Sequence, residues 1–145
     1  MKAGILIVTA ALVLSAAPIF AQADKLQKKN CATATDSAEC TAQALKIASE
    51  WKKANKGDYA SQRNVAFCFK DGCGGAIETS VVSACAWRMI IRAAENNKDV
   101  ADRWSFDADC KSLANSDRRT ALGEAEKLYK RIYGTQMPVE RLLSN

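Results

Sequence analysis

Six cysteines constrain the fold of this 145-residue chain more than any other feature of its sequence. Their number is even and all of them follow residue 30: Cys31, Cys40, Cys68, Cys73, Cys85 and Cys110. Zinc binding usually draws on histidine or on paired C-x-x-C motifs, and the sequence contains neither. The Cys68-x4-Cys73 spacing also differs from the C-x-x-C of thiol oxidoreductases. We therefore expect no metal site, and a disulfide framework if the chain enters an oxidising compartment.

The N-terminus has the pattern of a secretory signal peptide. Lys2 gives a positive start, Ala3 to Ala17 is an uncharged apolar run, and Ala21-Gln22-Ala23 fits the small-x-small rule for cleavage. A membrane anchor is the alternative, but the run is shorter than the roughly 20 residues that span a bilayer. We expect residues 1–23 to be cleaved after Ala23. The mature protein would then be periplasmic or secreted and would have no stable membrane anchor.

The charge is mildly basic and spread along the chain. The whole sequence carries 21 basic and 16 acidic side chains, a formal net charge of +5, and losing Lys2 leaves +4. The densest cluster is Lys52, Lys53 and Lys56, and Glu50 precedes it. A solvated helix face explains this cluster better than a nucleic-acid patch, which would need more charge and interleaved aromatic residues. We expect no nucleic-acid partner.

Helical spacing of apolar residues predicts the first two helices. Residues 24–35 are polar and lack periodicity, so we expect a flexible lead. Asp36 and Glu39 then form a capping-box pattern at the start of a helix that Gly57 ends. Asp58 is suited to cap the next helix, which runs up to Gly72 and its glycine-rich turn.

The same criteria predict three further helices. We expect them from about Thr79 to Asn96, from Asp99 to Leu113, and from a Ser116 cap to Gly134. Residues 135–145 are expected to form an irregular tail. No stretch alternates with period two, so the domain at 36–134 is predicted to be all-α with about five helices.

The segment 57–94 resembles a Sel-one-like repeat, a helix-turn-helix unit related to tetratricopeptide repeats. The matching residues are Gly57-Asp58, Gln62, Asn64, Val65-Ala66, Phe69, Gly72-x-Gly74 and Ala84-x-x-Trp87. The chain departs from the family in a longer turn before Ala84 and in Arg88, where tyrosine is common. The resemblance implies antiparallel helix pairs and an adaptor function through a groove between helices.

Six cysteines allow 15 connectivities. We expect three pairs: Cys31–Cys40, Cys68–Cys73 and Cys85–Cys110. The first would join the lead to the first helix, the second would close the glycine turn, and the third would join the third and fourth helices.

The sequence offers little for catalysis. It has no histidine, which removes Ser-His and Cys-His dyads and imidazole metal ligands. Paired carboxylates stay formally open, with four glutamates as candidates: Glu39, Glu50, Glu78 and Glu95. Two acidic patches, Asp107-x-Asp109 and Asp71 with Glu78, are better explained as turns and caps than as calcium ligands. We expect no cofactor.

The favoured function is therefore an exported protein-interaction or adaptor module without catalytic activity. Its partner would be an envelope protein, acidic if the basic side chains beside the apolar helix faces bind it. The candidate binding residues are Arg63, Arg88 and Arg92, and the last two lie one helical turn apart. A small cell-envelope hydrolase and an inhibitor or stress-protection protein are the alternatives. Three tryptophans, Trp51, Trp87 and Trp104, are expected to be core anchors.

Overall fold

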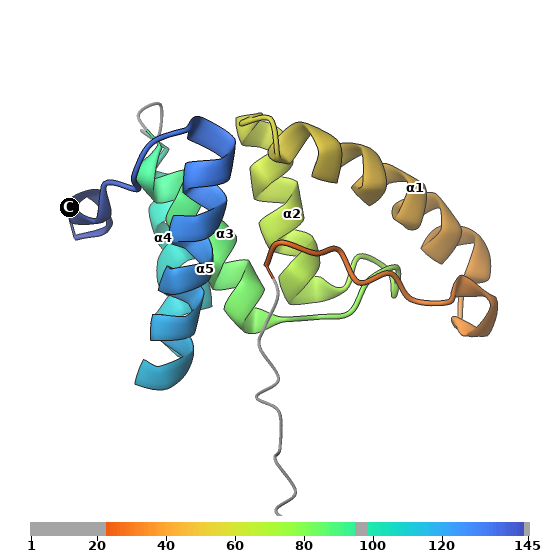
Figure 1. The fold of residues 1–145 in the computed structure, drawn as a ribbon. Coiled ribbons are helices and arrows are strands. Elements are labelled where there is room, and N and C mark those ends of the chain that lie inside the picture. The colour runs from red at the N-terminus through yellow and green to blue at the C-terminus, as the bar shows by residue number, and fades with distance from the viewer. Residues whose placement is uncertain (1–22, 95–98, 144–145) are drawn as a thin grey trace, which may run out of the picture.

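The computed structural model describes residues 23–94 and 99–143, and this part of the chain is all-helical (Figure 1). Its elements follow the order η1 (Cys31–Thr33), α1 (Ser37–Ala54), α2 (Tyr59–Asp71), α3 (Val81–Ala93), α4 (Val100–Cys110), α5 (Asn115–Tyr133) and η2 (Val139–Leu142). The prediction of an all-α domain with five helices is confirmed. One isolated antiparallel bridge, between Lys28 and Ile77, is the only β-type pairing among the described residues.

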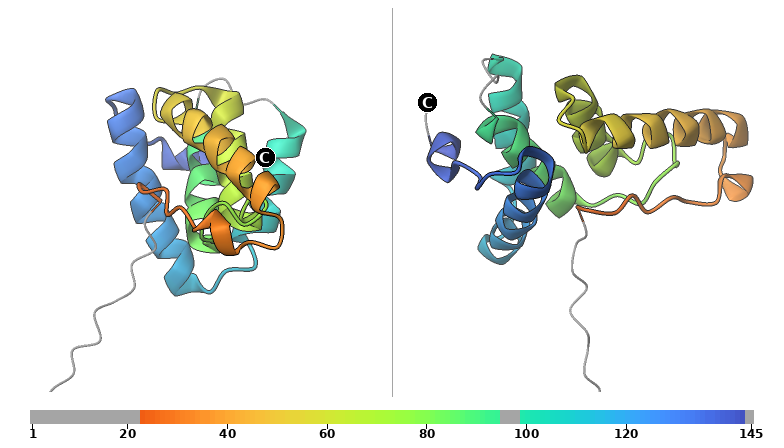
Figure 2. Two further views of the ribbon diagram at one scale, coloured as in Figure 1. Left: turned by 90° about the vertical axis from the view of Figure 1, so that its right-hand side faces the viewer. Right: turned by 45° about the horizontal axis from the view of Figure 1, so that its top comes forward.

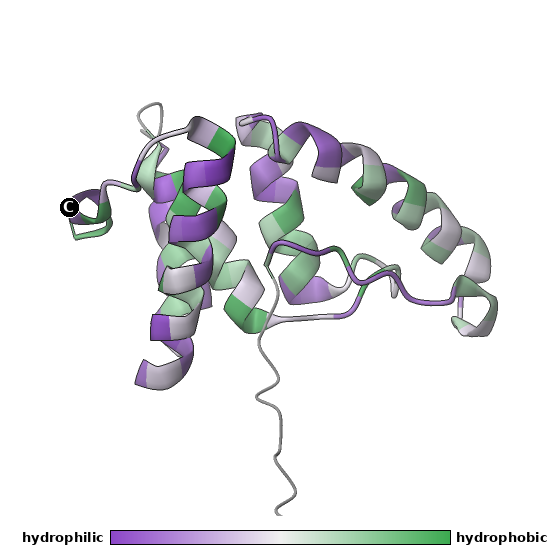
Figure 3. Ribbon diagram, viewed as in Figure 1, coloured by the Kyte–Doolittle hydropathy of each residue, from purple (hydrophilic) through white to green (hydrophobic). Residues whose placement is uncertain are grey.

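Helix α3 is the centre of the fold. It buries ten of its 13 residues, and Trp87, Ile90 and Ile91 are among the largest side chains that are fully buried. Helices α2, α4 and α5 pack around α3, while α1 packs on α2 (Figures 1 and 2). The surrounding helices alternate hydrophilic and hydrophobic residues along their length (Figure 3). This pattern is expected of helices that turn one face toward a shared core.

Side-chain caps explain where four of the helices begin. The side chain at each N-cap accepts a hydrogen bond from a backbone N–H of the first turn, which has no partner within its helix. The four caps are Asp36 on Glu39, Asp58 on Ser61, Ser80 on Ser83 and Asp99 on Ala101. The predicted caps at Asp36 and Asp58 are thus confirmed.

The predicted cap at Ser116 is wrong. Helix α5 begins at Asn115, and Ala114 at its N-cap offers no side-chain acceptor. Ser116 lies inside the first turn, where its carbonyl oxygen accepts from the hydroxyl of Thr120 at 3.1 Å. The turn into α5 is held instead by Arg118, whose Nη2 donates to the carbonyl oxygens of Lys111 and Leu113, each at 3.1 Å. A long side chain returning to the preceding turn is not visible in a capping pattern.

Three disulfides join the expected cysteine pairs. Cys31–Cys40 ties η1 to α1, Cys68–Cys73 closes the turn after α2, and Cys85–Cys110 joins α3 to α4. The last pair spans 25 positions, so closing that loop contributes on the order of 3 kcal/mol in the chain-entropy account.

The segment 24–35 differs from the flexible lead that we expected. It runs beside the turn between α2 and α3 (Figure 1), and the two backbones exchange hydrogen bonds. Lys29 N–H donates to the Ala76 carbonyl and Glu78 N–H donates to the Gln27 carbonyl, both at 2.9 Å. Backbone pairing with a distant turn leaves no periodic signal in a polar sequence, which is why sequence patterns miss it.

The described part of the tail after α5 packs against the domain. Met137 is buried, and Arg141 of η2 donates from Nη1 to the Ala93 carbonyl of α3 at 2.9 Å. This bond holds η2 against the end of the central helix. Within the described ranges, no helix is both long and apolar enough to cross a membrane.

Candidate binding site

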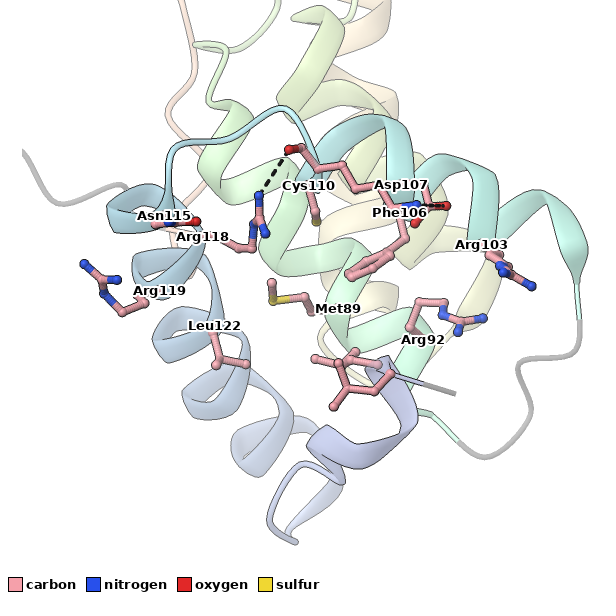
Figure 4. Close-up of a pocket in the computed structure, with 13 residues that line it drawn as sticks. Met89, Arg92, Arg103, Phe106, Asp107, Cys110, Asn115, Arg118, Arg119 and Leu122 are labelled. Atoms are coloured by element: carbon pink, nitrogen blue, oxygen red, sulfur yellow. Dashed lines mark hydrogen bonds and ion pairs between the residues drawn. The ribbon is translucent and has the colours of Figure 1, made fainter. Parts of the chain in front are cut away.

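A cavity of about 540 Å³ opens between α3, α4, α5 and η2 (Figure 4). Its volume lies within the range typical of sites for small ligands or for inserted side chains. Its floor is apolar: Met89 and Cys110 are almost fully buried, and Phe106, Leu122 and Leu142 are partly buried beside them.

The rim of this cavity is strongly cationic. Five basic side chains line it, against one acidic side chain, which gives the lining a net charge of +4. The basic residues are Arg92, Arg103, Lys111, Arg118 and Arg119, and the acid is Asp107. Lys111 and Asp107 form an i,i+4 ion pair with 2.8 Å between Nζ and Oδ2. We name the apolar floor and its basic border the cationic cavity. Such an arrangement suits a ligand that is both anionic and partly apolar.

Two polar clusters hold α4, one wall of the cavity, against α2 and α3. Near the C-terminal end of α4, the buried carboxylate of Asp109 accepts from Arg88 Nε of α3 at 2.9 Å and also pairs with Lys70 of α2. Only 7% of Arg88 is exposed, so its charge is neutralised inside the protein. Breaking such a buried pair leaves an uncompensated charge, which is strongly destabilising.

The second cluster lies at the N-terminal end of α4. Arg63 of α2 contacts Asp99 at 2.9 Å and the fully buried side chain of Asp102 at 3.1 Å. The hydroxyl of Tyr59 donates to the other oxygen of Asp102. Burial, reinforced by the Asp102 carboxylate, raises the pKa of Tyr59 to about 12. Tyr59 therefore stays a neutral donor well above physiological pH.

The three arginines expected to bind a partner do not share one surface. Arg63 and Arg88 pair with acids seven residues apart on α4, roughly 10 Å along the helix axis. Arg88 and Arg92 lie one turn apart on α3, but Arg88 is buried against Asp109 while Arg92 lines the cationic cavity. The sequence places both on α3 but cannot show that Asp109 of α4 buries Arg88.

An exposed tryptophan lies on α4, outside the lining of the cavity. Trp104 was expected to be a core anchor, but 73% of it is exposed, as is 66% of Val100 one turn earlier on α4. Around the helix, Trp104 is about 60° from Asp107 and about 100–160° from the other α4 residues that line the cavity. The expectation holds for Trp87, which is fully buried, and Trp51 packs edge-on against it with ring centroids 5.5 Å apart.

Among the described residues, the candidate catalytic glutamates do not form a pair of the kind used in hydrolysis. Glu39 and Glu50 line the same hollow of about 320 Å³, but they lie 11 positions apart on α1. That separation is roughly 16 Å along the helix, against about 5–9.5 Å in carboxylate-pair enzymes. Glu78 pairs with Lys29 instead, and Glu95 lies outside the described residues.

Three of the four acidic residues considered as calcium ligands pair with basic side chains. Asp107 pairs with Lys111, and Asp109 pairs with Arg88 and Lys70. In the described part of the chain, no group of three or more cysteine, aspartate, glutamate or histidine side chains is placed to hold a metal ion.

Comparisons with protein-family models, with curated proteins and with solved structures found no match to this chain. The resemblance of residues 57–94 to a Sel-one-like repeat therefore stays a prediction based on the residues alone.

Most of the cationic cavity was not anticipated from the sequence. Arg118 and Arg119 precede Leu122 by one turn on α5, and Arg103 stands one turn before Phe106 on α4. The cavity could have been predicted in part from these basic residues, which border an apolar stripe on each of the two helices. That the two stripes converge beside Arg92 follows only from the packing of α4 and α5 on α3.

Proposed function

We propose that this protein is an exported protein-interaction module, periplasmic or secreted and without catalytic activity. It binds an acidic, partly apolar segment of another envelope protein in the cationic cavity. The observation that carries this proposal is the net charge of +4 on the lining of an otherwise apolar cavity. Arginine side chains are well suited to carboxylates because their planar forks form paired hydrogen bonds.

Two exposed apolar residues on α4, the helix that forms one wall of the cavity, favour a protein over a small amphiphilic anion. A ligand confined to about 540 Å³ would leave Trp104 and Val100 uncovered. A protein segment that inserts one or two apolar side chains could also cover both. Exposed tryptophan is costly in water, and tryptophan and arginine are enriched among the residues that dominate protein interfaces.

Export is supported by the disulfides and by the N-terminal pattern. Three disulfides in a domain of this size are typical of oxidising compartments outside the cytoplasm. The charged start and the apolar run followed by small residues near the N-terminus supply a route to such a compartment.

Selection from a display library of short random peptides tests the proposal without assuming a partner. We expect the selected peptides to combine aspartate or glutamate with a large apolar residue, and to lose affinity for a Trp104→Ala variant. Selection without acidic enrichment would contradict an acidic partner. Dodecanoate serves as the probe for a small amphiphilic anion. If dodecanoate binds and no peptide is selected, the ligand is such an anion and the adaptor function is wrong.

A further inference from the structure

Ala23 is part of the packed domain. Its surface is fully buried, and both of its backbone polar groups are bonded to residues far away in the sequence. Its N–H donates to Oε2 of Glu124 on α5 at 2.9 Å, and its carbonyl oxygen accepts from the indole Nε1 of Trp87 on α3 at 3.1 Å. Ala23 thus bridges the central helix and α5.

The bond to Trp87 is important because it satisfies a hydrogen-bond donor in the core. Trp87 is fully buried, and an indole N–H can only donate. Without Ala23 this donor would lose its acceptor in the core, and the space filled by Ala23 would be empty. A buried donor without a partner bears the full cost of its lost hydration.

The bond to Glu124 matters for a second reason. Burial raises the pKa of Glu124, the nearby Asp24 carboxylate adds to the increase, and the Ala23 N–H opposes it. A positive charge on the chain just before Ala23 would further favour the ionised carboxylate.

We propose that export processing cuts the Ala21–Gln22 bond, so that Ala23 stays in the mature protein as a buried link between α3 and α5. Water hydrolyses this peptide bond: its oxygen completes the Ala21 carboxylate and its two protons complete the new α-ammonium of Gln22. This ammonium stands one residue before the amide that Glu124 accepts. The proposal does not depend on the function of the cationic cavity.

The sequence alone does not select this bond. Ala21 provides the small residue at the cut, but Ile19 takes the place where Ala21 stands in the Ala21-Gln22-Ala23 pattern. The small-x-small rule therefore favours a cut after Ala23. That cut would remove the residue whose backbone is bonded to both Trp87 and Glu124. Gln22 is too large for the cut position, which excludes the Gln22–Ala23 bond.

The direct test is the N-terminus of protein exported from the full-length precursor in a bacterial host. N-terminal peptide analysis and intact mass should show a chain that begins at Gln22, in free or cyclised form. A chain beginning at Asp24 would overturn the proposal, because Ala23 would be absent. Beginnings at Pro18 or Met1 would overturn the assigned bond.

A second test measures the link itself in mature chains that begin at Gln22 or at Asp24. The shorter chain should melt roughly 4–12 °C lower, since it leaves the Trp87 indole unpaired. Glu124→Ala should lower Tm in the longer chain and have much less effect in the shorter one, as expected of coupled groups. Glu126→Ala, an exposed control on the same helix, should change neither. Equal melting of the two chains, or equal effects of Glu124→Ala in both, would show that Ala23 is not a structural link.

Discussion

Asp109 is the residue on which two cations from different helices converge. Arg88 reaches it from α3 and Lys70 from α2, and both Asp109 and Arg88 are buried. Because α4 carries one wall of the cationic cavity, this carboxylate stabilises the fold and also fixes the position of the candidate binding site.

Replacing Asp109 should therefore be costly. We expect Asp109→Ala to lower the free energy of unfolding by about 3–5 kcal/mol, since it leaves Arg88 buried without a counter-charge. Asp107→Ala is the matched control two residues earlier, where the lost pair with Lys111 is at the surface and worth less than about 1 kcal/mol. Urea unfolding of both variants measures the difference, and equal losses would contradict the role given to Asp109.

Tyr59 gives the fold a pH dependence in alkaline solution. Its pKa is raised to about 12 in the folded state, above the ordinary value of 10.0. The stabilisation is therefore complete below about pH 10 and is lost as the pH rises toward 12, because the unfolded chain loses the phenol proton first. The free energy of unfolding from pH 9 to 11.5 should fall more steeply for the wild type than for Tyr59→Phe. Parallel curves would show that Tyr59 does not titrate differently on folding.

At the scale of the elements, helix ends are set by caps and by glycine. Gly72 ends α2 with φ +83°, and an added Cβ would lie 3.2 Å from Thr79 Cγ2. Gly123 lies within α5, and an added Cβ would meet nothing within 4 Å. The same substitution should therefore act in opposite directions at these two positions.

Gly72→Ala should destabilise the protein by more than about 1 kcal/mol, because alanine rarely adopts positive φ and the added methyl crowds Thr79. Gly123→Ala should stabilise it by about 0.5–1 kcal/mol, because alanine favours a helix interior. Thermal unfolding compares the two. The same sign at both positions would contradict the helix boundaries described here.

The elements were more predictable than their arrangement. Local signals such as Asp36, Asp58 and the glycine turns act within a few residues, so the sequence shows them directly. By contrast, Arg88 and its partner Asp109 are 21 positions apart in the sequence, and Ala23 is 64 positions from Trp87. Spacing within one helix says nothing about such contacts. For the same reason Trp104 was misplaced in the core, and four of the five basic residues of the cavity rim were missed.

At the scale of the whole molecule, the cationic cavity connects the fold to a function. The Cys85–Cys110 disulfide, the Asp109 cluster and the Arg141 bond hold α3, α4 and η2 in fixed positions around it. A binding site whose helices are already fixed in position loses less conformational entropy when a partner docks. The rim charge should then govern the choice of partner and make binding sensitive to salt.

The most direct measurement is the affinity of an acidic, apolar peptide selected on the wild-type protein for two charge-reversal variants. Arg119 is exposed on the cavity rim, and Lys52 is exposed on α1, so neither substitution should disturb the fold. We expect Arg119→Glu to weaken binding at least about tenfold in fluorescence anisotropy and Lys52→Glu to have little effect, since only Arg119 borders the cavity. Equal weakening by both variants, or none by Arg119→Glu, would contradict binding at the cationic cavity.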